Sequence, residues 1–351
     1  MLGRGHALAT HEKLLGRYVV ARDQLLGEGG FASVFKGLDT KECVNVAVKI
    51  YTPDDESALQ QYTHAISVLT AITESAEKTT LTDWGHRLSC DNRALQCELQ
   101  RSFGDEDARD LSMALERMDL GQCMVRLLDF SRDDDGEPGA DGDSDLCFMV
   151  LELGGESLRD RLDSYLEDAG GPGSLPAGEM KELLWSLVCI TWALHTAGFV
   201  HLDVKPENVV LFDGDSGDRG QWKLIDLDGA VHSGVNLPPN SGTFSPMYMA
   251  PECAQSIQDG ADMLASRFMD VWSVAMCVMD AIFLRPVLEP WYEAWARETG
   301  SDCKFLRWLA DRDSEPIISG DMKELISGLD GELCGLLEGM LRSSSTPTPA
   351  P

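Results

Sequence analysis

The chain has 351 residues, of which 43% are hydrophobic, and a formal net charge of −30. This length and composition are those of a globular protein with about two domains or lobes. So negative a charge repels nucleic acid and anionic membrane surfaces and excludes them as partners. It favours basic partners, although an acidic surface also serves solubility alone.

The cysteine pattern and the apolar runs indicate the cellular compartment of the protein. The ten cysteines are scattered, without a Cys-x-x-Cys pair or clustered histidines, which argues against a zinc site and against a disulfide scaffold. The longest apolar run, 271–284, is too short to span a bilayer and contains Asp280. Residues 1–9 lack the apolar core of a signal peptide. The sequence therefore predicts an intracellular protein, cytoplasmic or nuclear.

The first part of the chain predicts strands followed by a helical insertion. Residues 1–17 form a short leader, and residues 18–50 form three strands. Apolar residues recur at helical spacing in the insertion 51–105, first at Leu59, Tyr62, Ile66, Leu69 and Ile72 and then at Leu95, Leu99 and Phe103. These helices either pack on the strands or form a docking surface. A further helix, 105–118, begins with three acidic residues that suit its N-terminus.

The rest of the chain combines short strands with longer helices. Strands are predicted at 124–128, 147–152 and 222–225, and an amphipathic helix at 183–195. Residues 131–145 are acidic, rich in glycine and nearly free of hydrophobic side chains, so we expect a disordered hairpin loop there. The tail contains only Ser, Thr, Pro and Ala and is expected to be flexible.

The run His201–Asn208 (His-Leu-Asp-Val-Lys-Pro-Glu-Asn) points most directly to a chemistry. It places the carboxylate of Asp203, the ammonium of Lys205 and the carboxamide of Asn208 on one short loop. A second carboxylate, Asp226, follows the next predicted strand. Asn208 and Asp226 suit Mg²⁺, which binds few protein oxygens together with substrate phosphates. Asp203 is then free to position a hydroxyl and Lys205 to neutralise phosphate charge, as phosphoryl transfer requires.

Two upstream segments agree with a phosphate site. Gly27, Gly29 and Gly30 lie between two predicted strands, where glycine lets backbone N–H groups approach phosphates. Alone, such a glycine-rich hairpin is more often only a turn. Lys49 is the single charged residue of the apolar strand 46–50, where an unpaired ammonium is costly.

These motifs stand in the order found in one protein family. The run 201–208 resembles the catalytic loop of protein kinases, and residues 226–228 (Asp-Leu-Asp) resemble their metal-binding Asp-Phe-Gly. The two upstream segments resemble the glycine-rich loop and the lysine strand of that family. Residues 249–252 (Met-Ala-Pro-Glu) and 270–273 (Asp-Val-Trp-Ser) resemble the end of the activation loop and the start of a long helix. The chain is identified as a member of the eukaryotic-type protein kinase family, by a resemblance that covers about residues 18–342.

The resemblance implies the bilobal protein-kinase fold, of the α+β class. The small, β-rich N-lobe is expected at 18–152, with the helical insertion 51–105 and the acidic loop 131–145. The larger, α-helical C-lobe is expected at 153–342, before the tail 343–351.

The resemblance also implies ATP and Mg²⁺ as cofactors and protein as the acceptor. Asp203 is expected to orient the acceptor hydroxyl, Lys205 to hold the γ-phosphate and Lys49 the α- and β-phosphates. Asn208 and Asp226 are expected to hold Mg²⁺. The remaining nucleotide contacts are expected from the glycine-rich loop, the hinge strand and the apolar residues around adenine: Leu26, Gly27, Gly29, Gly30, Val34, Ala47, Glu152, Gly154 and Val210. Leu151 is expected at the gatekeeper position.

Within the family, the sequence favours the serine/threonine branch. Lys-Pro-Glu at 205–207 resembles that branch, and Ser245 falls at the site of the threonine that bonds the catalytic Asp and Lys. Protein substrates are implied, with a preference for basic ones from the net charge. The acid that pairs with Lys49 is either Asp110 or Glu106, and the sequence does not fix the oligomeric state.

Three positions depart from the family pattern. Leu202 replaces the arginine that receives the activation-loop phosphate, which argues against control by phosphorylation there. Asp228 replaces a glycine, and Glu252 has no evident arginine partner. Two alternatives to an active protein kinase follow. One is a pseudokinase-like, nucleotide-binding scaffold. The other is a small-molecule phosphotransferase of the aminoglycoside or choline kinase type, which also uses a His-x-Asp…Asn loop.

Overall fold

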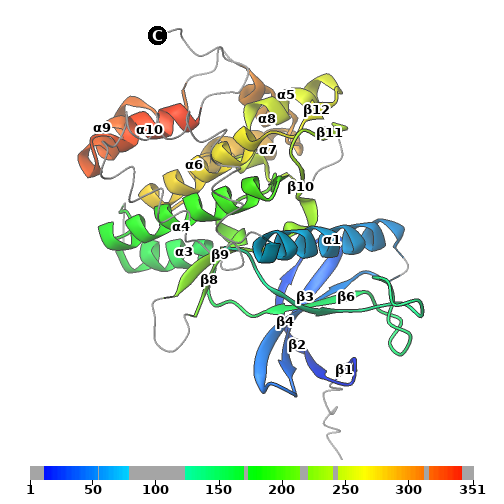
Figure 1. Ribbon diagram of the computed structural model, residues 1–351. Coiled ribbons are helices and arrows are strands. Elements are labelled where there is room, and N and C mark those ends of the chain that lie inside the picture. The colour runs from blue at the N-terminus through cyan, green and yellow to red at the C-terminus, as the bar shows by residue number, and fades with distance from the viewer. Residues whose placement is uncertain are drawn as a thin grey trace, which may run out of the picture. The chain divides into compact units, whose positions relative to one another are not determined.

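The computed structural model describes residues 12–53, 55–78, 123–169, 173–213, 220–239, 244–311 and 316–341. The chain divides into two compact units, Met1–Ala71 with Val125–Gly155, and Ile72–Met124 with Glu156–Pro351. The first is built on a β-sheet and the second mainly on helices (Figure 1). The predicted α+β fold with a β-rich lobe and a helical lobe is confirmed, whereas the lobe boundary at residue 152 stays a prediction.

The described part of the first unit forms an antiparallel sheet in the order β1-β2-β3-β4-β6-β5. Its strands are β1 (Glu12–Leu14), β2 (Tyr18–Glu28), β3 (Ala32–Asp39), β4 (Val44–Tyr51), β5 (Leu127–Phe130) and β6 (Phe148–Glu152). Alternate residues of β4, namely Val46, Val48 and Ile50, enter one apolar core, as the period of two in a strand requires. The strands predicted at 18–50 and 147–152 are therefore present, whereas the strand predicted at 124–128 is shifted to β5, which begins at Leu127.

Residues 12–14 form a strand, which corrects the prediction that 1–17 is only a leader. β1 pairs antiparallel with β2, with Leu14 opposite Tyr18. The Leu14 side chain is fully buried in the core of the sheet. Three residues carry too short a pattern to be recognised in the sequence, and the strand exists because the neighbouring strand pairs with it and buries Leu14.

The turn after β1 is fixed to the end of β3 by a buried carboxylate. Asp39 is 2% exposed, and it accepts hydrogen bonds from Arg17 Nε at 2.8 Å and Nη2 at 2.6 Å. The hydrogen bonds from Arg17 lower the pKa of Asp39 from 3.8 to about 2. Because the folded-state pKa is the lower one, the pair stabilises the fold above pH 3.8, and this stabilisation is lost as the pH falls through about 2.

We therefore expect Asp39→Asn to flatten the pH dependence of the unfolding free energy between about pH 4 and pH 2. The measurement is urea unfolding followed by circular dichroism at a series of acidic pH values. Asp23→Asn, which changes an exposed carboxylate on β2, is the matched control. An unchanged slope in Asp39→Asn would contradict the prediction.

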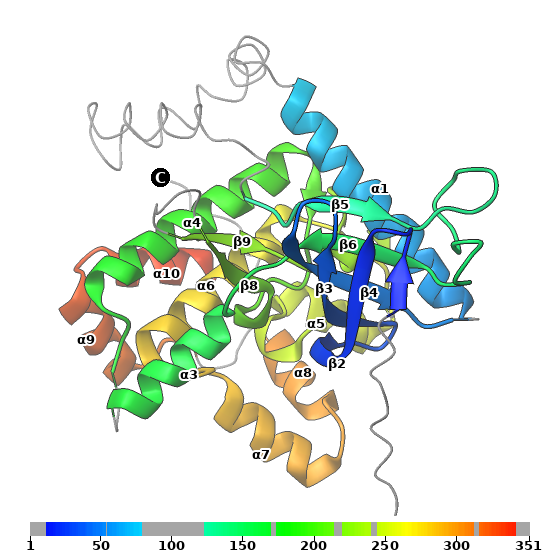
Figure 2. The same cartoon turned by 90° about the horizontal axis from the view of Figure 1, so that it is seen from below.

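Helix α1 (Glu56–Lys78) confirms the first helix predicted in the insertion. It follows β4 and runs across the sheet (Figures 1 and 2). The Tyr62 ring packs edge-on against Tyr51, with 5.3 Å between the ring centroids, and the Tyr62 hydroxyl donates to the Ser131 carbonyl. These contacts favour the packing role over the docking role for α1. The helices predicted from 95 to 118, with Glu106 and Asp110, lie outside the described residues.

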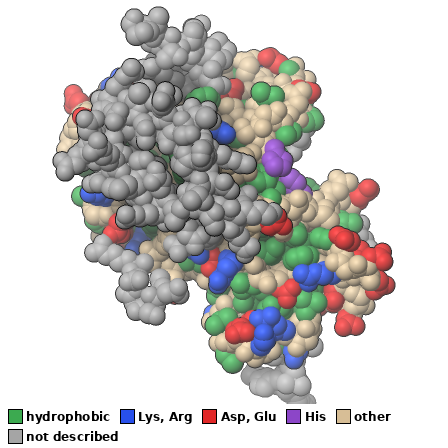
Figure 3. Space-filling view, viewed as in Figure 1, with side chains coloured by type: hydrophobic (Ala, Val, Ile, Leu, Met, Phe, Trp, Pro, Cys, Tyr) green, Lys and Arg blue, Asp and Glu red, His purple; other side chains and the backbone are tan. Residues whose placement is uncertain are grey.

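The acidic loop 131–145 follows a defined path, which corrects the prediction of disorder. Ser131 is fully buried and its hydroxyl donates to the Gly139 carbonyl at 2.7 Å. The Asp133 carboxylate accepts from the N–H of Asp135 at 3.0 Å. Acidic side chains that bond the backbone of their own loop give it a structure that composition does not reveal. Most carboxylates of this loop are exposed, and acidic side chains are visible along one edge of the face in Figure 3.

The second unit combines helices with short antiparallel strand pairs. Its helices are α3 (Leu158–Ala169), α4 (Ala177–Thr196), α5 (Pro251–Asp259), α6 (Arg267–Phe283), α7 (Glu289–Thr299), α8 (Cys303–Ala310), α9 (Gly320–Leu329) and α10 (Leu333–Met340). The paired strands are β7 (Phe199–Val200) with β10 (Val231–His232), β8 (Val209–Phe212) with β9 (Gln221–Leu224), and β11 (Asn236–Leu237) with β12 (Met263–Leu264). The helix predicted at 183–195 and the strand predicted at 222–225 are present in α4 and β9.

Helix α6 forms the centre of the second unit. It is buried along most of its length, and both α4 and α10 pack against it (Figure 1). A helix enclosed in this way carries its two carboxylates, Asp270 and Asp280, into the interior, where each requires hydrogen-bond donors. Among the described helices, none is both long and apolar enough to cross a membrane.

Candidate active site

A buried carboxylate of α6 holds the start of the loop 201–208. Asp270 accepts from the backbone N–H of His201 through Oδ2 and from that of Leu202 through Oδ1, both at 2.9 Å. Its Oδ2 also lies 2.9 Å from Nε2 of His195, in the last turn of α4. Asp270 is fully buried, so these charge-assisted bonds fix the path of the chain from α4 into the loop.

Leu202 adopts a strained backbone conformation at this anchor. Its φ of 70° lies in the left-handed region, which costs a non-glycine residue about 1–3 kcal/mol. The hydrogen bond from its N–H to Asp270 stabilises this conformation. The Leu202 side chain is buried. The position that carries arginine elsewhere in the family therefore contributes an apolar side chain to the interior and no guanidinium to the surface.

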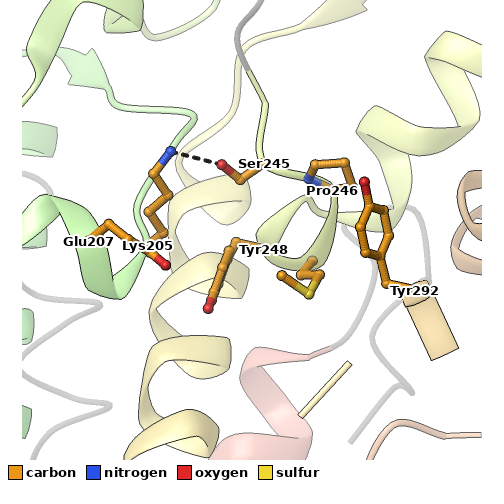
Figure 4. Close-up of a pocket in the computed structure, with 7 residues that line it drawn as sticks. Lys205, Glu207, Ser245, Pro246, Tyr248 and Tyr292 are labelled. Carbon is orange, nitrogen blue, oxygen red and sulfur yellow. Dashed lines mark hydrogen bonds between the residues drawn. The ribbon is translucent and has the colours of Figure 1, made fainter. Parts of the chain in front are cut away.

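Three groups converge on the Asp203 carboxylate. Lys205 Nζ donates to its Oδ2 at 2.7 Å, and the Ser245 N–H donates to its Oδ1 at 3.0 Å. Asn208 Nδ2 lies 3.4 Å from Oδ2 and donates to the Asp203 carbonyl at 2.9 Å. Lys205 Nζ also donates to Ser245 Oγ at 2.9 Å (Figure 4). The carboxylate is 12% exposed, so it is held in one orientation while it keeps access to a reacting group.

Asn208 and Asp226, the predicted magnesium ligands, lie close together along the backbone. The Ile225 N–H donates to the Asn208 carbonyl at 2.9 Å, which places Asp226, the next residue, beside Asn208. Because Asn208 Nδ2 points to Asp203, its Oδ1 is the side-chain atom left for a cation. The described residues contain no group of three or more His, Cys, Asp or Glu that could hold a metal. Two protein oxygens suit Mg²⁺, which takes its other ligands from phosphates and water.

In the first unit, the sheet register gathers the predicted nucleotide residues. Val34 lies opposite Lys49, and Ala47 lies opposite Leu151. Because directly opposed residues and residues two apart share a face, these four side chains lie on one face of the sheet. Lys49 is 9% exposed. Leu26 and Gly27 lie near the end of the adjacent β2 strand, and Gly29 and Gly30 lie in the turn that follows.

The remaining predicted nucleotide residues lie at three other places. Glu152 ends β6, where its side chain accepts from the Arg126 N–H at 2.8 Å and its own N–H donates to the Arg126 carbonyl at 3.0 Å. Gly154 lies in the segment that follows β6. Val210 belongs to the second unit, on β8, where it forms an isolated bridge with Ser157. The structure assigns Glu152 a role within the sheet that the sequence did not reveal.

A cavity of about 320 Å³ opens beside Lys205 and Ser245 in the second unit. Figure 4 shows the residues around it, which come from the loop 201–208, the turn 245–248 and α7. Its lining residues are Lys205, Glu207, Ser245, Pro246, Met247, Tyr248 and Tyr292. Most of this wall is apolar. At its edge lie the Lys205 ammonium, which donates to Asp203, and the Ser245 hydroxyl, which accepts from Lys205.

The departures from the family pattern have local explanations. The positive φ of the 226–228 motif falls on Asp226, at 60°, and Asp228 lies in a short 3₁₀ turn, Leu227–Gly229, with an ordinary φ. An aspartate is therefore accommodated here without strain from a missing glycine. Glu252 lies in the first turn of α5, and its lack of an arginine partner stays a prediction.

The buried residues that anchor the loop 201–208 and the turn 245–248 were not identified in the sequence analysis. Asp270 anchors the loop, and Asp280 bonds Tyr248 and Arg159 in the interior. A signal existed, because both aspartates interrupt an otherwise apolar helix, and a buried carboxylate requires donors. The donors themselves lie far away in the sequence and are found only in the structure.

Comparison with known proteins gives a coherent result. A family model described as Protein kinase domain matches residues 92–331. Human Citron Rho-interacting kinase is 29% identical over 206 residues, which are 56% of this chain and 9% of that protein. Mitogen-activated protein kinase kinase kinase 20 of Arabidopsis thaliana is 29% identical over 165 residues, 46% of this chain and 43% of that protein. Serine/threonine-protein kinase ksp1 of Schizosaccharomyces pombe is 35% identical over 92 residues, 26% of this chain and 19% of that protein.

These matches cover different parts of the chain. The chain spans less than half the length of each of these relatives. The family match includes the loop 201–208, the 226–228 motif and all of α6, but it begins after Lys49 and the glycine-rich turn.

Proposed function

The chain belongs to the protein kinase domain family, and from this premise we propose that it transfers the γ-phosphoryl group of Mg·ATP to serine and threonine hydroxyls of proteins. The observation that carries the proposal is the Asp203 carboxylate, held between Lys205 and the Ser245 N–H. Phosphoryl transfer requires mostly positioning and electrostatic stabilisation, and this cluster supplies both.

Asp203 would position the acceptor. Both of its oxygens are already bonded to donors of the loop and the turn, so the carboxylate does not have to reorient when the hydroxyl arrives. Its remaining lone pairs accept the hydroxyl proton, and the hydroxyl oxygen is then directed at the phosphorus. The Lys205 ammonium, shared between Asp203 and Ser245, would stabilise the negative charge of the transferred group.

Each unit carries residues that we propose for nucleotide binding. From the second unit, Asn208 and Asp226 would hold Mg²⁺, which neutralises phosphate charge when it is bound. From the first unit, Lys49 would contact the α- and β-phosphates and the backbone of the glycine-rich turn would donate to phosphate oxygens. Leu26, Val34, Ala47 and Val210 would contact adenine.

The cavity beside Lys205 and Ser245 would receive the acceptor protein. Two of its lining residues, Lys205 and Ser245, bond Asp203 through the ammonium and the backbone N–H, so a residue seated in the cavity would lie next to the acceptor residue. A wall formed by Pro246, Met247 and Tyr248 suits a side chain with apolar surface. The net charge of −30 favours approach of basic proteins over a longer range.

The test is transfer of radiolabelled phosphate from Mg·ATP to myelin basic protein, followed by phosphoamino-acid analysis. Labelled phosphoserine or phosphothreonine is the expected product. No transfer, together with a melting temperature that ATP still raises, would replace the proposal with the nucleotide-binding scaffold that Leu202 and Asp228 suggested. Labelling of added small alcohols instead of the protein would identify a small-molecule phosphotransferase.

Removal of the proposed metal ligands should change the Mg²⁺ requirement. We expect Asp226→Asn to raise the Mg²⁺ concentration for half-maximal transfer by at least about tenfold, because a charged ligand is lost. Titration of Mg²⁺ at saturating ATP measures this effect. Asp168→Asn, an exposed carboxylate on α3, is the matched control. Wild-type Mg²⁺ dependence in Asp226→Asn would contradict its assignment as a ligand.

A further inference from the structure

Lys49 and Tyr51 lie on the same face of β4. Val46, Val48 and Ile50 enter the apolar core of the sheet, and successive side chains of a strand point to opposite faces. Lys49 and Tyr51, which alternate with them, therefore lie on the other face. This is the face that carries the residues proposed for nucleotide binding, and Tyr51 extends it by one position beyond Lys49.

The ammonium of Lys49 lies over the ring of Tyr51. Its Nζ is 5.7 Å from the ring centroid, within the range of about 6 Å in which the negative face of an aromatic ring attracts a cation. Lys49 is 9% exposed and Tyr51 is 1% exposed, so little water competes with this attraction. The ring attracts the charge as a whole, so the ammonium can still direct its N–H donors at oxygen ligands such as phosphates.

The ring of Tyr51 is itself held from two sides. Along the backbone, Tyr51 pairs with Ala32 of β3, and its N–H donates to the Cys147 carbonyl at 2.9 Å. From α1, the ring of Tyr62 packs edge-on against it, with 5.3 Å between the centroids, an arrangement that aromatic rings prefer. The ring of Tyr51 is therefore held in one position before any ligand arrives.

Tyr62 is in turn fixed by Ser131. The Tyr62 hydroxyl donates to the Ser131 carbonyl and lies 2.9 Å from Ser131 Oγ. That Oγ donates to the Gly139 carbonyl at 2.7 Å and accepts from the Phe148 N–H at 3.0 Å. Burial raises the pKa of Tyr62 above its ordinary value, so the hydroxyl keeps its proton and remains a donor. Contacts run from Ser131 through two tyrosines to Lys49, all within the first unit.

We propose that Tyr51 is a positioning residue for Lys49, whose ammonium it holds by a cation–π contact on the face of the sheet that receives the nucleotide. This inference rests on the proposed function, in which Lys49 contacts the α- and β-phosphates. A lysine side chain is long and flexible, and ordering it when a ligand binds costs free energy. The ring supplies this order in advance. The contact is independent of the acid predicted to pair with Lys49.

The experiment measures the dissociation constant of Mg·ADP by isothermal titration calorimetry. ADP carries both phosphates that Lys49 would contact and is not consumed by transfer. Tyr51→Phe keeps the ring and should bind Mg·ADP within about twofold of the wild type. Phenylalanines of increasing fluorination at position 51 keep nearly the same ring size but weaken its negative face. The dissociation constant should therefore rise stepwise along this series, by about tenfold in all.

Two controls separate positioning from packing. In the Lys49→Met background, the fluorinated series should give one constant value, because the cation is absent. Position 18 provides the matched control in the same unit. Tyr18 is also fully buried, and the guanidinium of Arg17 lies 5.0 Å from its ring centroid. Fluorinated phenylalanines in place of Tyr18 should leave the dissociation constant of Mg·ADP unchanged.

The outcomes distinguish this inference from the proposed function. A dissociation constant that does not change with fluorination at position 51, while Lys49→Met weakens binding, would overturn the inference alone. So would tighter binding along the series, or a stepwise rise that persists in Lys49→Met. No binding of Mg·ADP by the wild type, or wild-type binding in Lys49→Met, would instead overturn the proposed nucleotide site and this inference with it.

Discussion

Replacement of Asp203 by alanine is expected to lower kcat for phosphoryl transfer by about 10²–10⁴-fold, the usual contribution of a positioned general base. The structure gives the physical reason. Asp203 is the point at which Lys205 and the Ser245 N–H converge, and it is the carboxylate to which the acceptor hydroxyl would be bonded. Without it, the hydroxyl loses both its proton acceptor and its orientation.

This prediction is specific because binding should survive the substitution. The proposed nucleotide contacts come from other residues, so ATP should still raise the melting temperature of Asp203→Ala. Single-turnover kinetics at saturating ATP measure the loss of transfer directly. Asp168→Ala, which removes an exposed carboxylate of the same unit, should keep the wild-type rate. A rate in Asp203→Ala within about tenfold of the wild type would show that the reaction uses another base or another site.

The second large effect is expected at Asp270, on stability as well as activity. Asp270→Ala removes the acceptor of the His201 and Leu202 N–H groups, and each buried donor left without a partner costs about 1–3 kcal/mol. The left-handed backbone of Leu202, with its φ of 70°, loses the bond that stabilises it. We expect the free energy of unfolding to fall by about 2–6 kcal/mol and transfer to be lost, because the loop that carries Asp203 loses its anchor.

Urea unfolding followed by tryptophan fluorescence measures this change, since several tryptophans lie in the second unit. Asp262→Ala provides the control, because that aspartate is exposed and lies shortly before the same helix. Asp270→Asn should fall between the wild type and Asp270→Ala, since it keeps one acceptor oxygen but presents an amide donor to the other N–H. Wild-type stability in Asp270→Ala would contradict an anchoring role.

The parts of the site that the sequence predicts are those in which the chemistry demands certain residue types close together in the chain. Asp203, Lys205 and Asn208 stand within six residues, and their side chains are joined in the structure. Ser245 was placed beside them by resemblance, and its bonds to Asp203 and Lys205 are present. The strands around Lys49 were predictable because a period of two in apolar residues is a local property.

Other predictions failed where local pattern and tertiary structure disagree. The strand at Leu14 was missed because three residues show no period, and pairing with Tyr18 created it. The loop 131–145 was predicted to be disordered from its charge. Its serine and aspartate side chains instead satisfy backbone groups of the loop, a local geometry that composition does not encode.

The sequence by itself determined the family and the α+β class and indicated the residues that we propose for phosphoryl transfer, because each depends on residue types at short and regular spacing. The tertiary structure alone decided what supports those residues. Asp270 lies 69 residues from His201, and Arg159 lies 121 residues from Asp280, yet each pair is hydrogen bonded. Such partners are chosen by burial, because a carboxylate inside a packed helix must find donors wherever the fold brings them, and no local pattern records where that is.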